Sequence, residues 1–251
     1  MIGIIGAGNM GSAIAFGIKG KVLLSDKNRR ISDNITVAKR SDIIILAIKP
    51  QDIGEVLKEI RPYVKEKLII SIAAGITTSS IEKALPGTRV IRVMPNMPAM
   101  AGKGISAISC GRFAKKGDLK TVSMIFLNLG EVIEVKEKTM DAVTAVSGSG
   151  PAYYFLFTYL LAKAAEASGL QKDIAVRLAR ATFIGAAEVI KLKDLSMEDL
   201  VKKVASKGGT TEAALKVFKQ EKLEAIIKKA VRSASQKSSN LTIRARHHLS
   251  S

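Results

Sequence analysis

A glycine-rich turn directly behind an apolar run at the start of the chain constrains the fold most strongly. The run covers residues 1–5, and the turn consists of Gly6, Ala7, Gly8, Asn9, Met10 and Gly11. In a strand–turn–helix unit with this G-x-G-x-x-G spacing, the first glycine permits the tight turn and the second lets a pyrophosphate approach the backbone. The third lets the helix pack closely on the strand. Because the N–H groups at the helix start face an anion, we predict a dinucleotide-binding site here.

Further short apolar runs predict the rest of a sheet. They cover residues 22–25, 42–47, 67–72, 88–93, 104–109 and 131–135. Continuous rather than alternating apolar runs are typical of parallel strands that are buried on both faces. Helical patterns lie between the runs at 51–64, from 79 onward and at 116–129, whereas the segment 26–41 has room only for a helix of a turn or two. We therefore predict an α/β fold whose N-terminal half is a Rossmann-type, mostly parallel sheet with helices on both faces.

Strand patterns disappear after about residue 148. Helices are predicted at 151–168, 172–192, 196–205, 211–220 and 222–235. We place a dinucleotide-binding domain at 1–148 and an all-α domain for substrate binding and dimerisation at 149–251. Residues 153–161 are apolar on every face of their helix, which requires burial all round. We expect a homodimer with interleaved helices, or a higher oligomer of such dimers, and the alternative is an ordinary core helix.

Composition excludes several classes of protein. The formal charge is +18, but the positive residues are spread along the chain and aromatic residues make up only 4%, which argues against nucleic-acid binding. The apolar stretch 151–162 is shorter than the roughly 20 residues of a membrane span, so we expect no membrane partner. Cys110 is the single cysteine and cannot form an internal disulfide, which favours the cytoplasm. The sequence contains no cluster of cysteine and histidine residues with the spacing of a metal site, so we expect no bound metal. The basic residues 244–248 are interpreted as a mobile tail whose function is left open.

The residues after the second strand give conflicting indications of the cofactor. Asp26 is placed to bind the ribose hydroxyls of NAD. Lys27, Arg29 and Arg30 follow it, and such cations bind the additional phosphate of NADP. We expect either NADPH or NADH, with a slight preference for NADPH.

Loops after three other strands are further candidates for cofactor contacts, because ligands of a doubly wound sheet gather at the carboxyl ends of its strands. The candidate residues are Ala47, Ile48, Lys49, Pro50, Ala74 and Asn96. The alternative interpretation is ordinary turn chemistry, since glycine and proline also punctuate these loops.

A second glycine loop lies in the helical half. Ser206, Lys207, Gly208, Gly209, Thr210 and Thr211 lead directly into a helix. Backbone N–H groups at a helix start, together with the hydroxyls of Ser206 and Thr211, form a site suited to a carboxylate. Taken alone, the loop is equally well a flexible helix cap.

Several motifs together resemble those of the pyrroline-5-carboxylate reductase family. They are residues 93–98, 147–153 and 206–215, with 6–11 and 47–50 in the cofactor half, and the resemblance covers residues 1–235. It implies NAD(P)H-dependent reduction of the imine 1-pyrroline-5-carboxylate to L-proline, the last step of proline biosynthesis. The substrate would lie between the sheet and the helical domain of a dimer. Gly208, Gly209, Thr210 and Thr211 would hold its carboxylate, with Thr211 and Ser206 as the catalytic candidates.

The sequence departs from that family pattern at two positions of these motifs. Lys207 stands where proline is usual, and Met97 stands where threonine or another small residue is common. Two other classes of protein share the first glycine turn. A β-hydroxyacid dehydrogenase uses a lysine followed four residues later by asparagine or aspartate, whereas Lys163 is followed by Ala167. A non-catalytic dinucleotide-binding module would not need the second glycine loop.

Overall fold

The structure is a computed structural model that describes residues 1–27 and 31–250, with side chains through residue 243. The chain divides into two compact units, one of residues 1–151 with 231–251 and the other of residues 152–230. The last helix therefore groups partly with the first unit, although the sequence places it in the second domain. The domain bounds 1–148 and 149–251 stay a prediction, and Arg29 and Arg30 lie outside the described residues.

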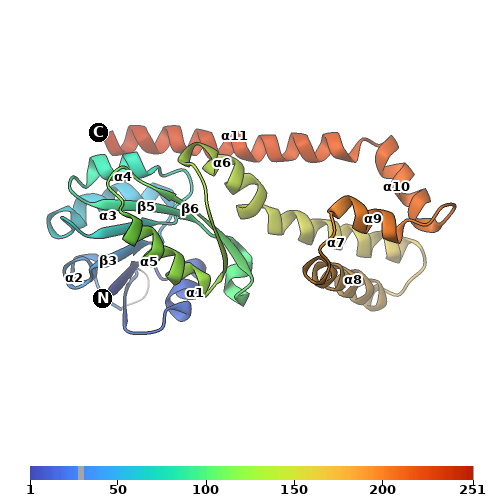
Figure 1. Cartoon of the computed structure of the whole chain (residues 1–251), viewed down its shortest axis with the longest axis horizontal. Helices are drawn as coiled ribbons and strands as arrows, with labels where there is room; N and C mark the ends of the chain where they lie inside the picture. Colours follow the sequence, from blue (N-terminus) through green and yellow to red (C-terminus); the bar gives the residue numbers. More distant parts are fainter. Residues whose placement is uncertain (28–30, 251) are drawn as a thin grey trace. The chain divides into compact units, whose positions relative to one another are not determined.

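The first unit is built on a seven-stranded sheet with the strand order β2-β1-β3-β4-β5-β6-β7 (Figure 1). Its strands are β1 Ile2–Ile5, β2 Val22–Ser25, β3 Ile43–Leu46, β4 Leu68–Ser71, β5 Arg89–Met94, β6 Gly104–Cys110 and β7 Gly130–Glu134. All neighbouring pairs are parallel except β5 and β6. The predicted mostly parallel sheet is confirmed. Its strand order reverses direction between β1 and β3, the point where such sheets bind ligands.

Helices cover both faces of this sheet. Helices α1 Asn9–Gly17 and α5 Lys116–Leu127 pack on one face, and α2 Asn34–Arg40, α3 Ile53–Ile60 and α4 Thr78–Ala84 pack on the other. Neighbouring residues of β3 illustrate the reason: Ile44 and Leu46 belong to one hydrophobic core, whereas Ile45 belongs to the other. Because both faces of the sheet are covered by helices, all four positions of β3 are apolar.

Local capping explains where the short helices begin. Helix α2 has 7 residues, which is the shortened helix that the segment length predicts, and Asp33 accepts the Thr36 N–H at 2.7 Å. Helix α4 begins at Thr78, one residue before the predicted start, because the Thr77 hydroxyl accepts the Ser80 N–H at 3.2 Å. Short 3₁₀ turns at Pro50–Asp52 and Arg61–Tyr63 flank α3, so the helix predicted over 51–64 is α-helical only in its middle.

A nearly continuous helical stretch leads from the sheet into the second unit. It consists of the 3₁₀ turn Glu137–Thr139, α6 Met140–Val143, a π-helical turn Thr144–Gly148 and α7 Gly150–Ala167. The Ser149 N–H donates to the Thr144 carbonyl at 2.9 Å, the five-residue spacing of a π turn. The expected boundary near residue 148 thus falls within helical structure rather than in an extended linker.

The second unit contains helices only. They are the greater part of α7, α8 Lys172–Leu192, α9 Met197–Val204, α10 Thr210–Gln220 and the beginning of α11 Leu223–Ser250. Ring contacts join Tyr154 to Phe183 and Phe157 to Phe218, with centroids 5.7 and 6.4 Å apart. In the described part of the chain, no helix combines the length and apolar character that crossing a bilayer requires.

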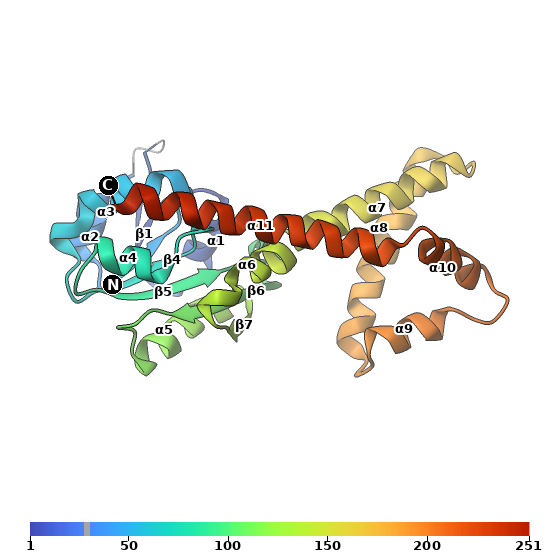
Figure 2. The same ribbon diagram turned by 90° about the horizontal axis from the view of Figure 1, so that it is seen from above.

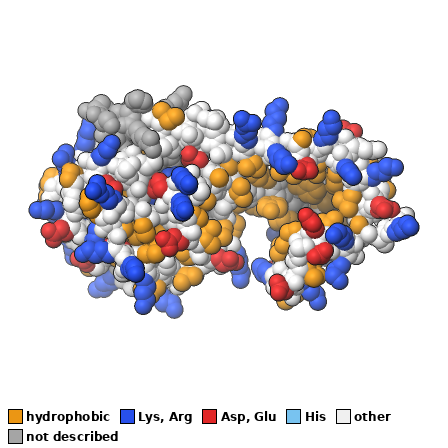
Figure 3. Space-filling view, turned by 45° about the horizontal axis from the view of Figure 1, so that its top comes forward, with side chains coloured by type: hydrophobic (Ala, Val, Ile, Leu, Met, Phe, Trp, Pro, Cys, Tyr) orange, Lys and Arg blue, Asp and Glu red, His pale blue; other side chains and the backbone are white. Residues whose placement is uncertain are grey.

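Helix α7 is not a core helix of a single chain. Tyr154, Leu156 and Tyr159 are 61%, 56% and 57% exposed. Hydrophobic side chains also gather on the surface of the helical unit in Figure 3. The core-helix alternative is therefore wrong within one chain, and the burial that so apolar a helix requires has to come from outside it.

Helix α11 is much longer than the sequence predicts. It was expected to end at residue 235 but reaches Ser250, so the basic residues 244–248 continue a helix and are not a separate mobile tail. Its C-terminal part packs on the first unit, near α4 (Figures 1 and 2). The Ser238 hydroxyl donates to the Asp141 carboxylate at 2.7 Å. A Cβ built on Gly75, whose φ is +75°, would lie 3.0 Å from the Cβ of Leu241.

Candidate active site

A cleft of about 450 Å³ opens at the carboxyl ends of β1, β2 and β3. Seven of the residues predicted to bind a cofactor line it: Gly6, Gly8, Asp26, Lys27, Ala47, Ile48 and Lys49. It lies at the reversal of strand order between β1 and β3, where the fold class predicts a ligand. Thus the structure brings together residues from three separate loops of the sequence.

The two outer glycines of the first turn are required by the protein itself. Gly6 has φ +103°, and a Cβ there would lie 2.4 Å from the carbonyl oxygen of Ala47. A Cβ on Gly11 would lie 2.0 Å from the carbonyl oxygen of Gly6. These positions exclude any side chain because the turn, the third strand and helix α1 are in contact there.

Gly8 differs from both of these glycines. Its φ of −69° suits any residue, and among the described residues no atom lies within 4 Å of a Cβ built on it. Gly8 faces the cleft and forms the N-cap of α1, where backbone N–H groups point outward. The space beside Gly8 and the outward N–H groups fit a pyrophosphate, which is the role that the G-x-G-x-x-G spacing gives to the middle glycine.

Backbone bonds hold the three strand ends of the cleft in register. The Gly6 N–H donates to the Ser25 carbonyl, and the Ala47 N–H donates to the Ile5 carbonyl, each at 2.8 Å. The Asp26 carboxylate accepts the Ala7 N–H at 2.8 Å. Asp26 therefore lies against the glycine turn, as a residue that binds the adenosine ribose should.

Other predicted cofactor residues lie beside the cleft rather than in its wall. Ala7 and Gly11 are buried, Met10 packs against the core under α1, and Pro50 begins the 3₁₀ turn before α3. Asn9 lines a separate hollow of about 800 Å³ between α1 and the 3₁₀ turn Met97–Ala101. Ala74 lies in the loop after β4, next to Gly75.

Sequence reasoning missed several residues of the cleft wall. They are Ile5, Ser25, Asn34, Gln51, Asp52 and Val56. Asn34 is the most defined of these, because its side-chain oxygen accepts the Ser25 hydroxyl and its amide donates to Glu59, both at 2.7 Å. The sequence signal that could have identified Asn34 was its position at the start of the short helix α2, which follows β2. Lys27 lies 3.5 Å from the carboxylate of Glu55.

A hydrogen bond joins two of the motifs that carry the family resemblance. The Asn96 side-chain oxygen accepts the Ile105 N–H at 3.0 Å, and its amide donates to the Ser147 hydroxyl at 3.3 Å. A Cβ on Gly148 would lie 2.8 Å from the terminal methyl of Met94. Asn96 thus ties the loop after β5 to the segment that leads into α7, and its predicted cofactor contact stays a prediction.

The second glycine loop is a tight turn that feeds α10. The Gly209 N–H donates to the Ser206 carbonyl at 3.0 Å, and Gly208 has φ +73°. A glycine with positive φ at the third of four residues is typical of a type II turn, whose second position favours proline. Lys207 occupies that second position, so the departure from the family pattern leaves the turn geometry intact. A Cβ on Gly209 would lie 2.6 Å from the Ser206 hydroxyl oxygen, which explains the second glycine.

Two of the four predicted carboxylate donors of this loop already have partners in the protein. The Gly209 N–H is used by the turn, and the Gly208 N–H donates to the Glu212 carboxylate at 2.6 Å. Thr210 and Thr211 are the first residues of α10, and N–H groups at these positions have no acceptor inside a helix. Sequence reasoning missed Glu212, although its place three residues after the N-cap is a known signal for such contacts.

Together, the doubly wound sheet, the cleft at its switch point and the all-helical second unit define a two-part protein of the Rossmann class. Comparison with known proteins narrows this class. Residues 137–241 match the family model for pyrroline-5-carboxylate reductase dimerisation, and residues 1–75 match that for coenzyme F420-dependent NADP oxidoreductases.

Relatives of known name resemble almost the whole chain. Pyrroline-5-carboxylate reductase of Synechocystis sp. is 40% identical over 83% of this chain and 78% of its own, and that of Methanosarcina acetivorans is 37% identical over 96% and 97%. The crystal structure of the Plasmodium falciparum reductase with NADP bound has a TM-score of 0.87 at 33% identity, covering 96% of this chain and 97% of its own. The Coxiella burnetii reductase has a TM-score of 0.89 at 32% identity, covering 96% and 98%.

The chain belongs to the pyrroline-5-carboxylate reductase family. It is an oxidoreductase that binds a nicotinamide dinucleotide. Membership in this family favours a pyrroline-5-carboxylate reductase over the two alternatives that the first glycine turn alone left open. These were a β-hydroxyacid dehydrogenase and a non-catalytic dinucleotide-binding module.

Proposed function

We propose that the protein reduces 1-pyrroline-5-carboxylate to L-proline by hydride transfer from NADPH or NADH to the imine carbon. The observation that carries the proposal is that a chain of this family has two glycine turns at helix starts, each suited to bind an anion. One borders the cleft at β1 and β3, and the other is the turn at the start of α10. The reaction needs both, because the cofactor carries a pyrophosphate and the substrate carries a carboxylate.

The cleft residues would hold the nucleotide. The backbone N–H groups at the start of α1, which follow Gly8, would bind the pyrophosphate. Asp26 would bind the adenosine ribose. The cofactor, when bound, supplies the hydride from its reduced nicotinamide ring. The protein's own contribution there is to orient the ring and to exclude water, which accounts for much of the catalysis in reactions of this kind.

We propose NADPH as the preferred cofactor by a small margin. The Asp26 carboxylate accepts the Ala7 N–H, so at least one of its oxygens is directed toward the glycine turn. Lys27 also borders the cleft and carries a positive charge. The ratio of kcat/KM for NADPH and NADH measures the preference, and Lys27→Ala is expected to lower this ratio. An unchanged ratio in Lys27→Ala would remove Lys27 from the explanation.

The second loop would hold the substrate. The N–H groups of Thr210 and Thr211 would bind its carboxylate, while Gly208 and Gly209 give the turn its shape. An imine accepts hydride more readily when its nitrogen is protonated or hydrogen-bonded. We assign this contact to the Thr211 hydroxyl, with the Ser206 hydroxyl as the second candidate. Thr211→Val keeps the shape of the side chain and is expected to lower kcat more than it raises the KM for the substrate.

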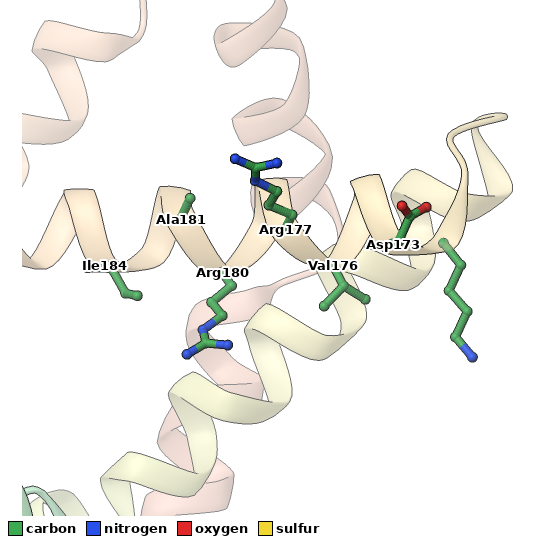
Figure 4. A pocket seen from close by; sticks show the side chains of 7 residues that line it. Asp173, Val176, Arg177, Arg180, Ala181 and Ile184 are labelled. Atoms are coloured by element: carbon green, nitrogen blue, oxygen red, sulfur yellow. The ribbon is translucent and has the colours of Figure 1, made fainter.

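We propose that the functional molecule is a homodimer whose helical units cover one another, with a higher oligomer of dimers as a further step. The exposed apolar residues of α7 are one reason. The other is a hollow of about 750 Å³ along α8, where Arg177 and Arg180 alternate with Val176, Ala181 and Ile184 (Figure 4). Sedimentation velocity measures the mass, and a stable monomer at micromolar concentration would contradict this assignment.

We keep the cytoplasm as the expected compartment, because Cys110 is the single cysteine and forms no internal disulfide. The expectation that neither nucleic acid nor a membrane is a partner also stays a prediction. A salt-dependent shift of duplex DNA by the purified protein would overturn the part that concerns nucleic acid.

The activity is tested by following the oxidation of NADPH and NADH by absorbance, with 1-pyrroline-5-carboxylate as the second substrate. We expect turnover and the formation of L-proline. Turnover of a β-hydroxyacid with NAD, without any reduction of the imine, would refute the proposal. Gly209→Ala provides the control for the second loop, since its methyl group would press against Ser206 and is expected to raise the KM for the imine while leaving cofactor affinity unchanged.

A further inference from the structure

The carboxylate of Glu212 fastens the second glycine turn to the helix that follows it. The Gly208 N–H donates to Oε2 of Glu212 at 2.6 Å. Glu212 lies in the first turn of α10, and Gly208 precedes the N-cap residue Gly209. A bond between a backbone N–H and an ionised carboxylate is stronger than one between neutral groups, so this contact is the main side-chain tie between the turn and α10.

The geometry differs from the usual capping box. In that motif the side chain three residues after the N-cap bonds to the N–H of the N-cap residue. Here the Gly209 N–H is already donated to the Ser206 carbonyl, and Glu212 reaches one residue further back, to Gly208. The two bonds together leave the N–H groups of Thr210 and Thr211 as the outward donors of the helix start.

The turn needs such a restraint. It contains two consecutive glycines, which have the largest backbone freedom of all residues. Its second position, where proline would fix φ, is Lys207. Without the contact to Glu212, the turn would be tied to α10 chiefly through the chain itself.

We propose that Glu212 is a positioning residue for substrate binding. It does not touch the substrate but holds the turn so that the Thr210 and Thr211 N–H groups converge on the carboxylate of 1-pyrroline-5-carboxylate. This inference rests on the proposed function of the loop. It predicts that loss of the Glu212 contact weakens binding of the carboxylate and leaves the cofactor site and the hydride step unchanged.

Three variants of Glu212 separate the hydrogen bond from the charge. Glu212→Gln keeps the length and an acceptor oxygen but loses the charge. Glu212→Asp keeps the charge, which favours a helix start, but is one methylene too short to reach Gly208. Glu212→Ala loses both, and Glu224→Ala removes a comparable exposed carboxylate from α11 as the matched control.

The steady-state kinetics of each full-length variant provide the test. In Glu212→Asp and Glu212→Ala, we expect the KM for the imine to rise by about tenfold, the loss typical of one charge-assisted hydrogen bond. We expect kcat and the KM for NADPH to stay within about twofold of the wild-type values. Glu212→Gln, whose neutral amide oxygen forms a weaker hydrogen bond, should raise the KM for the imine by less than Glu212→Ala does. Glu224→Ala should resemble the wild type in all three constants.

Hydrogen exchange of the Gly208 amide, measured by NMR, tests the contact without reference to activity. Exchange should be fastest in the Asp and Ala variants, and it should be less affected in Gln, which keeps an acceptor oxygen within reach. A wild-type KM in Glu212→Asp, or a KM in Glu212→Gln as high as in Ala, would show that the charge and not the reach matters, and would overturn the proposal. A KM for the imine below the wild-type value in Glu212→Ala would mean that Glu212 competes with the substrate carboxylate for the N–H donors of the turn, and it would also overturn the proposal. If the wild type does not reduce the imine, the proposed function fails even when the exchange pattern is as expected.

Discussion

Replacing two glycines of the first turn by alanine separates cofactor binding from folding. For Gly8→Ala, φ −69° and ψ −173° suit alanine, and no described atom lies within 4 Å of the new methyl group. Alanine reduces the entropy of the unfolded chain, which stabilises by about 0.4–1 kcal/mol. It is also a poorer N-cap than glycine by roughly 0.5–1 kcal/mol. The two effects offset each other, so the stability of Gly8→Ala should lie within about 1 kcal/mol of the wild type.

Gly11→Ala has the opposite expected outcome. Its methyl group would lie 2.0 Å from the Gly6 carbonyl oxygen in the same turn and 3.1 Å from the Cβ of Ala47, which follows β3. Overpacking of this kind costs about 1–3 kcal/mol, and the backbone contact places this case at the upper end. For a chain of this length, each 1 kcal/mol lowers the melting temperature by roughly 2–4 °C.

Thermal unfolding by circular dichroism and titration with NADPH by fluorescence measure the two properties independently. Gly8→Ala is expected to melt within about 4 °C of the wild type and to bind NADPH at least about tenfold more weakly, which corresponds to about 1.4 kcal/mol. Gly11→Ala is expected to melt well below both. The reasoning is refuted if Gly8→Ala binds NADPH as the wild type does, or if it destabilises the fold as much as Gly11→Ala.

Three further predictions concern other parts of the chain. Lys207→Pro should raise the free energy of unfolding by about 0.4–1 kcal/mol, because proline pre-sets the second position of the turn; urea denaturation measures this, and a loss of stability would contradict the type II assignment. Glu137→Gln should cost about 3 kcal/mol or more, since it leaves the Arg92 guanidinium, 2% exposed and 2.8 Å from Glu137, without its carboxylate. Adding Arg92→Met should recover part of that loss. If the free-energy losses of the two single variants simply add in the double variant, Arg92 and Glu137 do not interact as proposed. Burial, with the charge of Glu134, raises the pKa of the Cys110 thiol, so iodoacetamide should label it much more slowly in the folded than in the unfolded protein at pH 8; equal rates would contradict this.

The sequence predicted the strands and most helices of the first unit because their signals are local. Each central strand is a short apolar run between turn residues, and a strand buried on both faces needs nothing more to be recognised. The first glycine turn was equally clear, since the positive φ of Gly6 and the contact of Gly11 with the Gly6 carbonyl both arise within the strand–turn–helix unit. The contact of Gly6 with Ala47, by contrast, depends on the packing of β3 beside β1.

The length of the last helix and its packing on the first unit escaped sequence reasoning for a physical reason. The segment after residue 235 is polar and has no strong helical periodicity, so its helix is stabilised by contacts that lie far away in the sequence. Ser238 bonds to Asp141, 97 residues earlier, and Leu241 packs on Gly75. Such contacts depend on how elements pack together, which a single sequence does not reveal.

By itself, the sequence determined the class of sheet, the two glycine loops and the family that their motifs resemble. It did so because main-chain anion sites depend on glycine and on helix starts, both visible in the order of residues. Only the tertiary structure decided which side chains line the cofactor cleft, that Asn96 bonds to Ser147, and that Glu212 rather than a ligand takes the Gly208 N–H. These contacts depend on distances and directions between side chains and backbone, which the order of residues does not specify.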